Sequence, residues 1–289
     1  MTTDCRARSA ILFAIAATIF LAHPSGANAQ TLNLASTNDA PIDVYADNGI
    51  EWQQDNEVLI ARGNARAVRG GVNIFADVLR AYYRKDASGS SDLNRLDGAG
   101  KVRIVSASET IEGDGAVYDM DQAILVVTGR KVTYTSGTDV ITADKQMEYY
   151  ERDQKAVARG SAVAIHDGKK LQAQTIEAYF HKTTAGKTEV REVRAFDDVV
   201  IITEQEVARS DRAIYNVKSD LATLVGNVKI TRGESQLDGD QAEVNMKTGI
   251  SRLLTNNSRV RGIIVPQKRD PTAKGSKATS GNNKSGNTK

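Results

Sequence analysis

The sequence predicts an all-β protein, an antiparallel β-jelly roll built as a V-shaped, open-ended stack of bulged strands. Three observations predict it: an internal repeat of about 97 residues, short runs in which apolar and charged residues alternate, and only 4 prolines in 289 residues. Proline cannot donate a hydrogen bond to a strand ladder, so long strands exclude it. Outside the N-terminal segment, no part of the chain has a convincing helical period.

The first 29 residues are predicted to be an export signal. Arg6 and Arg8 precede an apolar run of twelve residues, Ile11 to Ala22, and Ala27-Asn28-Ala29 gives the small-x-small cleavage pattern. Twelve residues rise only about 18 Å as a helix, against a hydrocarbon core of about 30 Å. An uncleaved anchor is the alternative. Residues 30–40 then form a lead-in to the body.

The body, residues 41–265, is predicted from a duplication. When residue i is set beside residue i+97, Ala61-Arg62-Gly63 meets Ala158-Arg159-Gly160, and Gly129 meets Gly226. A partial third copy starts at Gly239. A fixed period of this kind indicates stacked structural units that bury one continuous core.

Within each copy, strands are predicted after recurring anchor residues. Alternation follows each anchor, as in Gly226-Asn-Val-Lys-Ile230, and turn clusters such as Asp167-Gly168 separate the runs. One apolar and one charged face are typical of half-buried antiparallel strands. The anchors are Gly63, Gly100, Gly129, Gly160, Asp197 and Gly226.

A one-residue slip in the alternation predicts bulges at matching points of successive strands. After Ala76-Asp77 the apolar residues return at Leu79 and Ala81, three and five positions after Ala76 instead of two and four. The same slip follows Gly113-Asp114, Ala173-Gln174 and Ser210-Asp211. Aligned bulges bend a sheet along one line, which predicts two sheet faces folded over each other. A propeller would need tryptophan-marked blades, and a parallel β-helix has shorter rungs.

The chemical groups in the sequence predict that the protein is not an enzyme. The 38 Lys+Arg and 36 Asp+Glu leave a formal charge of +2, which excludes nucleic-acid binding through bulk charge. No nucleophile elbow, P-loop or His-rich metal spacing occurs. His166 and His181 are interpreted as surface residues, and the recurring aspartates as bulge and turn residues rather than calcium ligands. No cofactor and no metal are expected, although paired glycosidase carboxylates stay open.

Small and large apolar residues alternate on the inward face, which predicts a groove between the two sheet faces. A face rich in alanine fills space poorly, but an ordinary sandwich core with close sheets is the alternative. The candidate groove residues are Ala65, Ala67, Ile74, Val102, Ile104, Val132, Tyr134, Ala162, Ala164, Val199, Ile201, Val228 and Ile230.

The last 24 residues, 266–289, are predicted to be a disordered basic tail. They contain six Lys or Arg and one Asp, and no apolar residue larger than alanine. Such a segment cannot bury enough surface to offset the entropy of ordering. Two interpretations remain, a solvated tail and contact with anionic lipid head groups.

The repeated strands resemble those of the OstA-like proteins of lipopolysaccharide export. The resemblance rests on the stretches Leu59 to Ala67 (LIARGNARA), Val157 to Ala162 (VARGSA) and Leu224 to Ile230 (LVGNVKI), and covers about residues 40–265. The export signal and polar tail make the soluble periplasmic bridge branch of that family the nearest match. The resemblance implies a periplasmic protein whose apolar groove carries the acyl chains of lipopolysaccharide from the inner to the outer membrane.

Two open ends predict assembly by strand addition. The edge candidates are Ile42 and Val44 at one end of the body and Ile263 and Val265 at the other. The expected partners are further copies of the chain, head to tail, and, by resemblance, an LptC-like inner-membrane protein and an LptD-like outer-membrane translocon. The rival interpretations are an exported β-solenoid enzyme and a structural repeat protein without lipid binding.

Overall fold

The structure of the protein is a computed structural model. It describes residues 41–265, apart from 86–90, 185–187, 205, 246–247, 249 and 256–259. The predicted signal (1–29), lead-in (30–40) and basic tail (266–289) lie outside the described residues.

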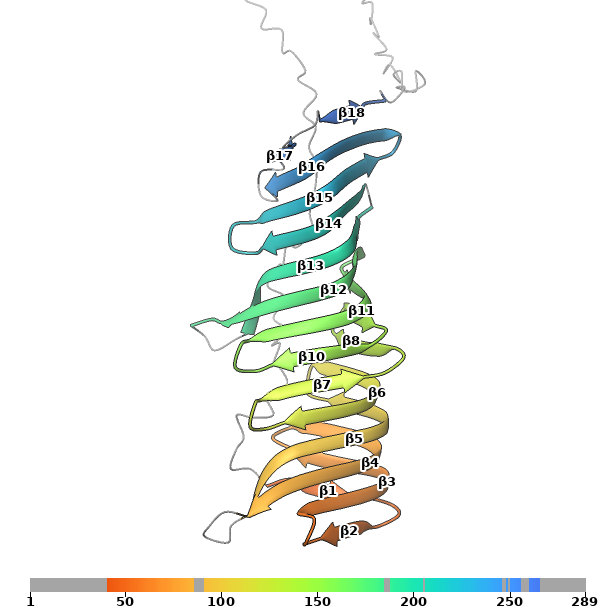
Figure 1. The fold of residues 1–289 in the computed structure, drawn as a ribbon, viewed down its shortest axis with the longest axis vertical. Coiled ribbons are helices and arrows are strands. Elements are labelled where there is room, and N and C mark those ends of the chain that lie inside the picture. Colours follow the sequence, from red (N-terminus) through yellow and green to blue (C-terminus); the bar gives the residue numbers. More distant parts are fainter. Residues whose placement is uncertain are drawn as a thin grey trace, which may run out of the picture.

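Over the described residues, the chain forms one 18-stranded antiparallel sheet, and none of those residues is helical (Figure 1). The first ten strands are β1 (Asp43–Tyr45), β2 (Ile50–Gln53), β3 (Val58–Arg69), β4 (Val72–Lys85), β5 (Ser91–Val105), β6 (Glu109–Asp119), β7 (Ile124–Thr128), β8 (Val132–Ser136), β9 (Asp139–Ala143) and β10 (Gln146–Tyr150). The remaining strands are β11 (Lys155–His166), β12 (Lys169–Lys182), β13 (Thr188–Ile202), β14 (Val207–Asn216), β15 (Leu221–Arg232), β16 (Ser235–Asn245), β17 (Ile250–Leu254) and β18 (Arg261–Ile263). The predicted all-β class is confirmed.

The duplication is visible in the strand boundaries. Strands β3, β4 and β5 begin and end 97 residues before β11, β12 and β13. The copies differ further along. In the first copy, Gly129–Lys131 separate β7 from β8, whereas the corresponding part of the second copy is the single strand β15. The first copy has one more residue between its glycine and the next inward valine, Val132, than the second has before Val228. That extra residue breaks the strand.

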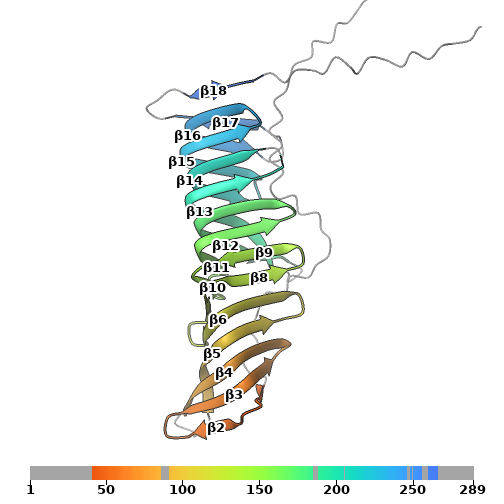
Figure 2. The same cartoon turned by 90° about the vertical axis from the view of Figure 1, so that its right-hand side faces the viewer.

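The long strands each contribute to two half-sheets. The N-terminal half of β3 pairs with β2, and its C-terminal half pairs with β1. We call the half-sheet that starts at β2, includes β7 and β10, and ends at β17 the first wing; the second wing starts at β1, includes β8 and β9, and ends at β18. The stack is long, and its strands bend over a common axis (Figures 1 and 2). This is the predicted V-shaped section.

A line of bulges, which we call the crease, joins the wings. Where β3 meets β4, Gly63 and Asn64 lie opposite the single residue Asp77, and all later long strands shift register at the same place. The predicted bulges are therefore confirmed. In each bulge, the extra residue lies on the strand that contains the anchor residue, such as Gly63 on β3. Both residues of each extra pair have positive φ, namely Gly63-Asn64, Gly100-Lys101, Gly160-Ser161, Asp197-Asp198 and Gly226-Asn227.

Side chains of neighbouring strands explain why glycine recurs at this crease. A Cβ on Gly226 would overlap the carboxylate of Asp211. The same carboxylate accepts a hydrogen bond from Asn227 Nδ2 at 2.9 Å, and Asp47 accepts one from Asn64 Nδ2 at 2.7 Å. Asparagine tolerates the left-handed conformation, so one side chain satisfies both the backbone and the aspartate.

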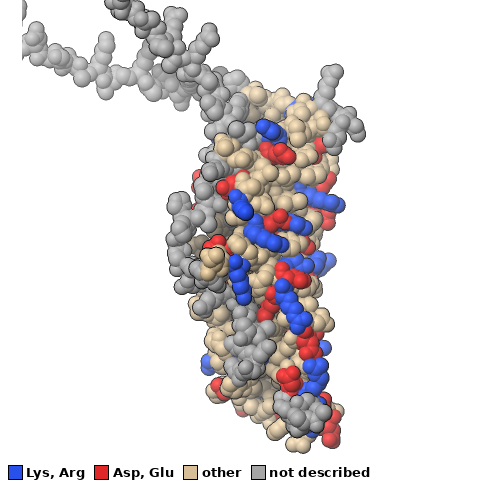
Figure 3. All heavy atoms as spheres, turned by 90° about the vertical axis from the view of Figure 1, so that its left-hand side faces the viewer, with Lys and Arg blue, Asp and Glu red and all other residues tan. Residues whose placement is uncertain are grey.

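The inward faces of the wings pack into two buried clusters. The larger cluster extends from Ala61 to Val199, and the smaller one groups Ala208, Leu224, Val228, Ile230 and Ala242. The outward surface carries a band of interleaved basic and acidic side chains along much of its length (Figure 3). Opposite charges across neighbouring strands stabilise a sheet and keep its outer face wet. No helix in the described part of the chain is long and apolar enough to cross a membrane.

Candidate functional site

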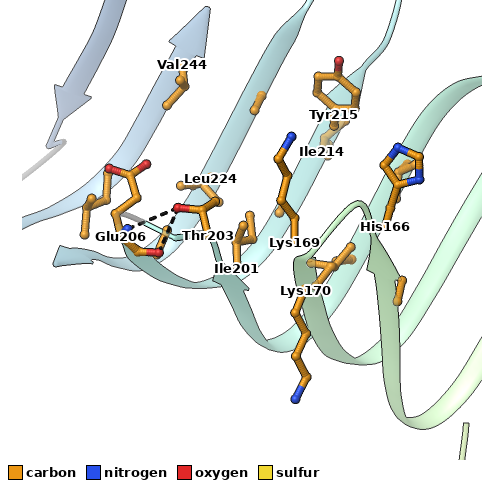
Figure 4. A pocket seen from close by; sticks show the side chains of 18 residues that line it. His166, Lys169, Lys170, Ile201, Thr203, Glu206, Ile214, Tyr215, Leu224 and Val244 are labelled. Atoms are coloured by element: carbon orange, nitrogen blue, oxygen red, sulfur yellow. Dashed lines mark hydrogen bonds between the residues drawn. The ribbon is translucent and has the colours of Figure 1, made fainter. Parts of the chain in front are cut away.

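An apolar pocket lies between the wings in the second repeat (Figure 4). Strands β11 to β16 supply its walls. The lining residues are Ala164, His166, Lys169, Lys170, Leu171, Val193, Ala195, Ile201, Thr203, Glu206, Ala208, Ala213, Ile214, Tyr215, Ala222, Leu224, Ile230 and Val244.

Both wings contribute to this lining because the bulges turn each strand's inward face from one wing to the other. On β13, for example, Val193 pairs with Tyr215 in the first wing, while Ile201 pairs with Ala208 in the second. Both lie on the inward side, and the register shift at Asp197-Asp198 lies between them. The pocket is the space between two alternating faces that do not fully interdigitate.

The rim has a basic end. His166 and Lys169 flank the turn between β11 and β12, and His166 Nδ1 contacts a carboxylate oxygen of Asp139. Lys169 shares the inward parity of Leu171, whereas Lys170 has the opposite parity, and their side chains point in opposite directions (Figure 4). The sequence interpretation of His166 as a surface residue is incomplete, because this ring is only partly exposed at the rim. His181 is exposed and lies 3.1 Å from the Glu189 carbonyl oxygen.

Glu206 and Thr203 lie away from this basic end (Figure 4). The Glu206 N–H donates to Thr203 Oγ1 at 3.1 Å, and the Thr203 N–H donates to the Glu206 carbonyl at 3.0 Å, which closes the turn between β13 and β14. Burial raises the pKa of the Glu206 carboxyl, and Arg232 partly opposes that shift. A protonated carboxyl at this position would make the mouth of the pocket less polar.

Tyr215 is the aromatic group of the lining. Its hydroxyl donates a hydrogen bond to Asp220 Oδ1 at 3.2 Å. Burial, with help from this carboxylate, raises the pKa of Tyr215 to about 12, so the phenol is neutral at physiological pH. Its ring therefore acts as apolar wall and its hydroxyl is already engaged.

The predicted groove residues separate into those that line the pocket and those that are packed away. Ala164, Ile201 and Ile230 line it. Tyr134 is partly buried against the larger cluster, and Val228 is buried in the smaller one. The other predicted residues lie inside the larger cluster, namely Ala65, Ala67, Ile74, Val102, Ile104, Val132, Ala162 and Val199.

Sequence reasoning missed the first-wing side of the pocket, including Val193, Tyr215, Ala222 and Val244. A signal for two of these residues was present. Tyr215 repeats Tyr118 at 97 residues, and Val193 resumes the inward parity before the bulge of β13. Following the parity across each bulge would have added them to the candidate set.

Most of the side chains that line the pocket are aliphatic. Among the residues that the structure describes, no group of three or more His, Cys, Asp or Glu side chains is placed to hold a metal ion. The lining combines many aliphatic side chains with a basic rim, a pattern that suits apolar chains attached to an anionic head group.

The ends of the stack present two edge strands each. β1 and β2 form one end, and β17 and β18 form the other, within the part of the chain that is described. The predicted edge residues Ile42 and Val44 are partly buried against the larger cluster, while Ile263 and Val265 are exposed. The sequence did not indicate β2, whose Trp52 is 62% exposed and donates from Nε1 to the Tyr83 hydroxyl at 2.6 Å.

Comparison with known families agrees with this geometry. The family model described as LptA/(LptD N-terminal domain) LPS transport protein matches residues 43–149 and again residues 141–250. The second match starts about one repeat after the first, so each copy of the duplication is itself a unit of the family. The chain belongs to this family. Membership places it among lipopolysaccharide transport proteins, which are transport components rather than enzymes.

Individual relatives are distant. An uncharacterized protein of Rhizobium meliloti (strain 1021), R00383, is 26% identical over 124 residues, which are 42% of this chain and 65% of that protein. The crystal structure of LptH, the LptA-homologous periplasmic component of the lipopolysaccharide transport device of Pseudomonas aeruginosa, aligns over 80% of this chain and 99% of that chain. Its sequence identity is 12% and its TM-score 0.18, so the assignment to the LPS transport family stands on the repeated family match.

Proposed function

We propose that this member of the LPS transport family is a periplasmic, LptA-like bridge protein that carries lipopolysaccharide from the inner to the outer membrane. The acyl chains of lipopolysaccharide would lie between the two wings. The observation that carries the proposal is the apolar pocket of β11 to β16 with its basic rim, in a chain built of two family units.

The energetics favour an acyl chain in this pocket. Transfer of apolar surface out of water yields about 0.8 kcal/mol for each buried CH₂ group, so a chain of several methylenes competes with solvent without any specific polar contact. Lys169 at the rim can attract a phosphorylated head group. The lining supplies affinity for the chains and the rim supplies an orientation.

The predicted export signal supports the periplasmic part of the proposal. Cleavage after Ala29 would release a chain that starts at Gln30 and contains no cysteine, since Cys5 is the only one. We expect the intact mass of the exported protein to lack residues 1–29. A mass that retained them would favour a membrane-anchored member of the transport system.

The open ends support the partners expected from the sequence: further copies of the chain, an LptC-like inner-membrane protein and an LptD-like outer-membrane translocon. Strand addition recognises mainly backbone groups, so one type of edge can serve several partners. A row of such contacts would align successive pockets into one path across the periplasm.

Lipopolysaccharide binding by the purified chain tests the proposal. Displacement of a fluorescent fatty-acid probe by lipopolysaccharide would be measured for the wild type, Ile201→Asp and Val200→Asp. Ile201 lines the pocket, and Val200 is its outward neighbour on β13. Because a buried unpaired charge is costly, we expect Ile201→Asp to weaken binding by about tenfold or more, and Val200→Asp to have little effect. A wild type that does not bind, or two variants that bind equally, would refute the proposed groove.

A further inference from the structure

We propose that the two repeats have divided their tasks: only the second repeat accepts acyl chains, and the first is a closed unit. The small residues Ala208 and Ala222, with Ile230, set the capacity of the pocket. The inference rests on the proposed function for the identity of the ligand. It rests on the comparison between repeats for the place of binding.

Residues that correspond in the two repeats differ in packing. Ala67 is 2% exposed and Ile104 is 1% exposed inside the larger cluster. Their counterparts 97 residues later, Ala164 and Ile201, are partly exposed and line the pocket. The residue types are identical in both pairs, so the difference comes from what surrounds them.

Those surroundings differ in size. Leu125 of the first repeat corresponds to Ala222, and Ile111 corresponds to Ala208. Leu125 and Ile111 belong to the larger buried cluster, whereas both alanines line the pocket. Met147 and Leu96 are likewise replaced by the smaller valines Val244 and Val193. Within the apolar interior, Val127 to Leu224 and Gly98 to Ala195 run the other way, but each adds less volume than is lost at Leu125 or Ile111.

The mouth of the first repeat is also closed by a hydrogen bond that the second repeat cannot form. Tyr134 pairs with Ile111, and its hydroxyl donates to the buried carboxylate of Glu109 at 2.9 Å. In the second repeat, Ile230 pairs with Ala208 and occupies the corresponding place. Glu206, which corresponds to Glu109, lies at the rim of the pocket. Isoleucine is shorter than tyrosine and cannot donate, so this bridge across the mouth is lost.

Charge at the rim identifies the class of occupant. Lys169 shares the inward face of the pocket wall, and the residue 97 positions earlier is the uncharged Val72, which is buried. The second repeat therefore couples an open apolar space to the Lys169 cation on its inward wall. The first repeat has Val72 at that place and a filled interior, and its cation at the equivalent turn is Arg69, the counterpart of His166. An amphiphile with acyl chains and an anionic head group matches that combination.

Single cysteines at corresponding alanines test the division with minimal disturbance. In the full chain carrying Cys5→Ser, Ala164→Cys and Ala67→Cys would each be exposed to a maleimide, with and without lipopolysaccharide. We expect the cysteine at position 164 to react at least tenfold faster than the one at 67, and lipopolysaccharide to protect it. Equal reactivity at the two positions would overturn the inference, as would protection of both to the same extent.

A graft of the first repeat's residue into the second tests the determinants. Ala222→Leu copies Leu125 and should reduce lipopolysaccharide binding about tenfold without lowering the melting temperature. Thr223→Leu, on the outward side of the same strand, is the matched control and should bind as the wild type does. Ile230→Tyr, which restores the phenol next to Glu206, should act like Ala222→Leu.

The outcomes separate the two proposals. If the wild type binds and the Ile201→Asp variant does not, while Ala222→Leu and Ile230→Tyr bind normally, the groove holds and the division between repeats is wrong. If the wild type fails to bind lipopolysaccharide at all, the proposed function is wrong, although the difference in maleimide reactivity between positions 164 and 67 would remain.

Discussion

At the scale of single residues, the crease depends on glycines for two reasons: the backbone has a positive φ there, and a neighbouring side chain leaves no room for a Cβ. Gly226 has a φ of +80°, and its α-carbon faces the side chain of Asp211 too closely for a Cβ. Gly233 also has a positive φ, of +56°, but nothing lies within 4 Å of its ideal Cβ. The two positions therefore separate backbone strain from steric overlap.

We expect Gly226→Ala to lower the free energy of unfolding by about 2–4 kcal/mol, because left-handed strain of about 1–2 kcal/mol adds to the overlap with Asp211. Gly233→Ala should cost only the strain, about 1 kcal/mol. Urea unfolding of both variants measures the difference. Equal losses would mean that the aspartate moves aside and that the crease tolerates a side chain.

The outward cluster around Glu148 gives a pH-dependent contribution. Burial alone would raise the pKa of this carboxyl, but hydrogen bonds from Arg159, Tyr150 and Gln146 outweigh it and hold the pKa below its usual value. The Glu148 side chain is 6% exposed, and Arg159 Nε lies 2.7 Å from its Oε1. A carboxyl with a depressed pKa stabilises the fold above its unfolded-state pKa, and this contribution is lost as the pH falls through the folded-state pKa.

We therefore expect Glu148→Gln to reduce stability at pH 7 by about 1–3 kcal/mol and to have little effect at a pH where the wild-type carboxyl is protonated. Thermal melts at several pH values measure this convergence. Glu51→Gln serves as the control, since the Glu51–Arg62 pair is exposed at both ends and should contribute little at any pH. A constant difference between Glu148→Gln and wild type across the pH range would contradict the assignment.

At the scale of elements, the strands and their bend could be predicted from the sequence because both depend on local periodicity. Alternation marks each inward face, and its slip after Ala76-Asp77 marks the bulge. The strand that carries the extra residues could not be located, because a bulge is a property of two paired strands. The break between β7 and β8 was not predicted either. The sequence shows the extra residue between Gly129 and Val132, but only the pairing shows that this residue ends one strand and begins another.

The site could be predicted only to the level of an inward face. Parity assigns Ile104 and Ile201 to the same role, yet Ile104 is packed in the larger cluster and Ile201 lines the pocket. The difference arises from Leu125 and Ala222, which lie on another strand, and from Tyr134 and Ile230 across the mouth. Such openness depends on side-chain volumes that meet from both wings, and no local window of sequence contains them together.

At the scale of the whole molecule, the stack formed by residues 41–265 is unclosed at both ends within the part of the chain that the structure describes. Exposed apolar side chains lie at both edges: Trp52 in β2, and Ile264, which is 59% exposed, just after β18. Two different edges that pair with each other make a heterologous contact, and such a contact propagates because no rotation closes it. The bulged crease continues to both ends, so an added copy would extend both wings and the space between them.

We therefore predict concentration-dependent head-to-tail association, measured by light scattering of the full chain. Ile263→Lys with Val265→Lys places charge on the C-terminal edge, which blocks strand addition, and should leave a monomer. Ile165→Lys is the control, because this residue is exposed on β11, away from both ends, and should associate as the wild type does. If the wild type stays monomeric at high micromolar concentration, or if the edge lysines leave association unchanged, the edges are not the contact. In that case, successive pockets could not form a continuous path by strand addition.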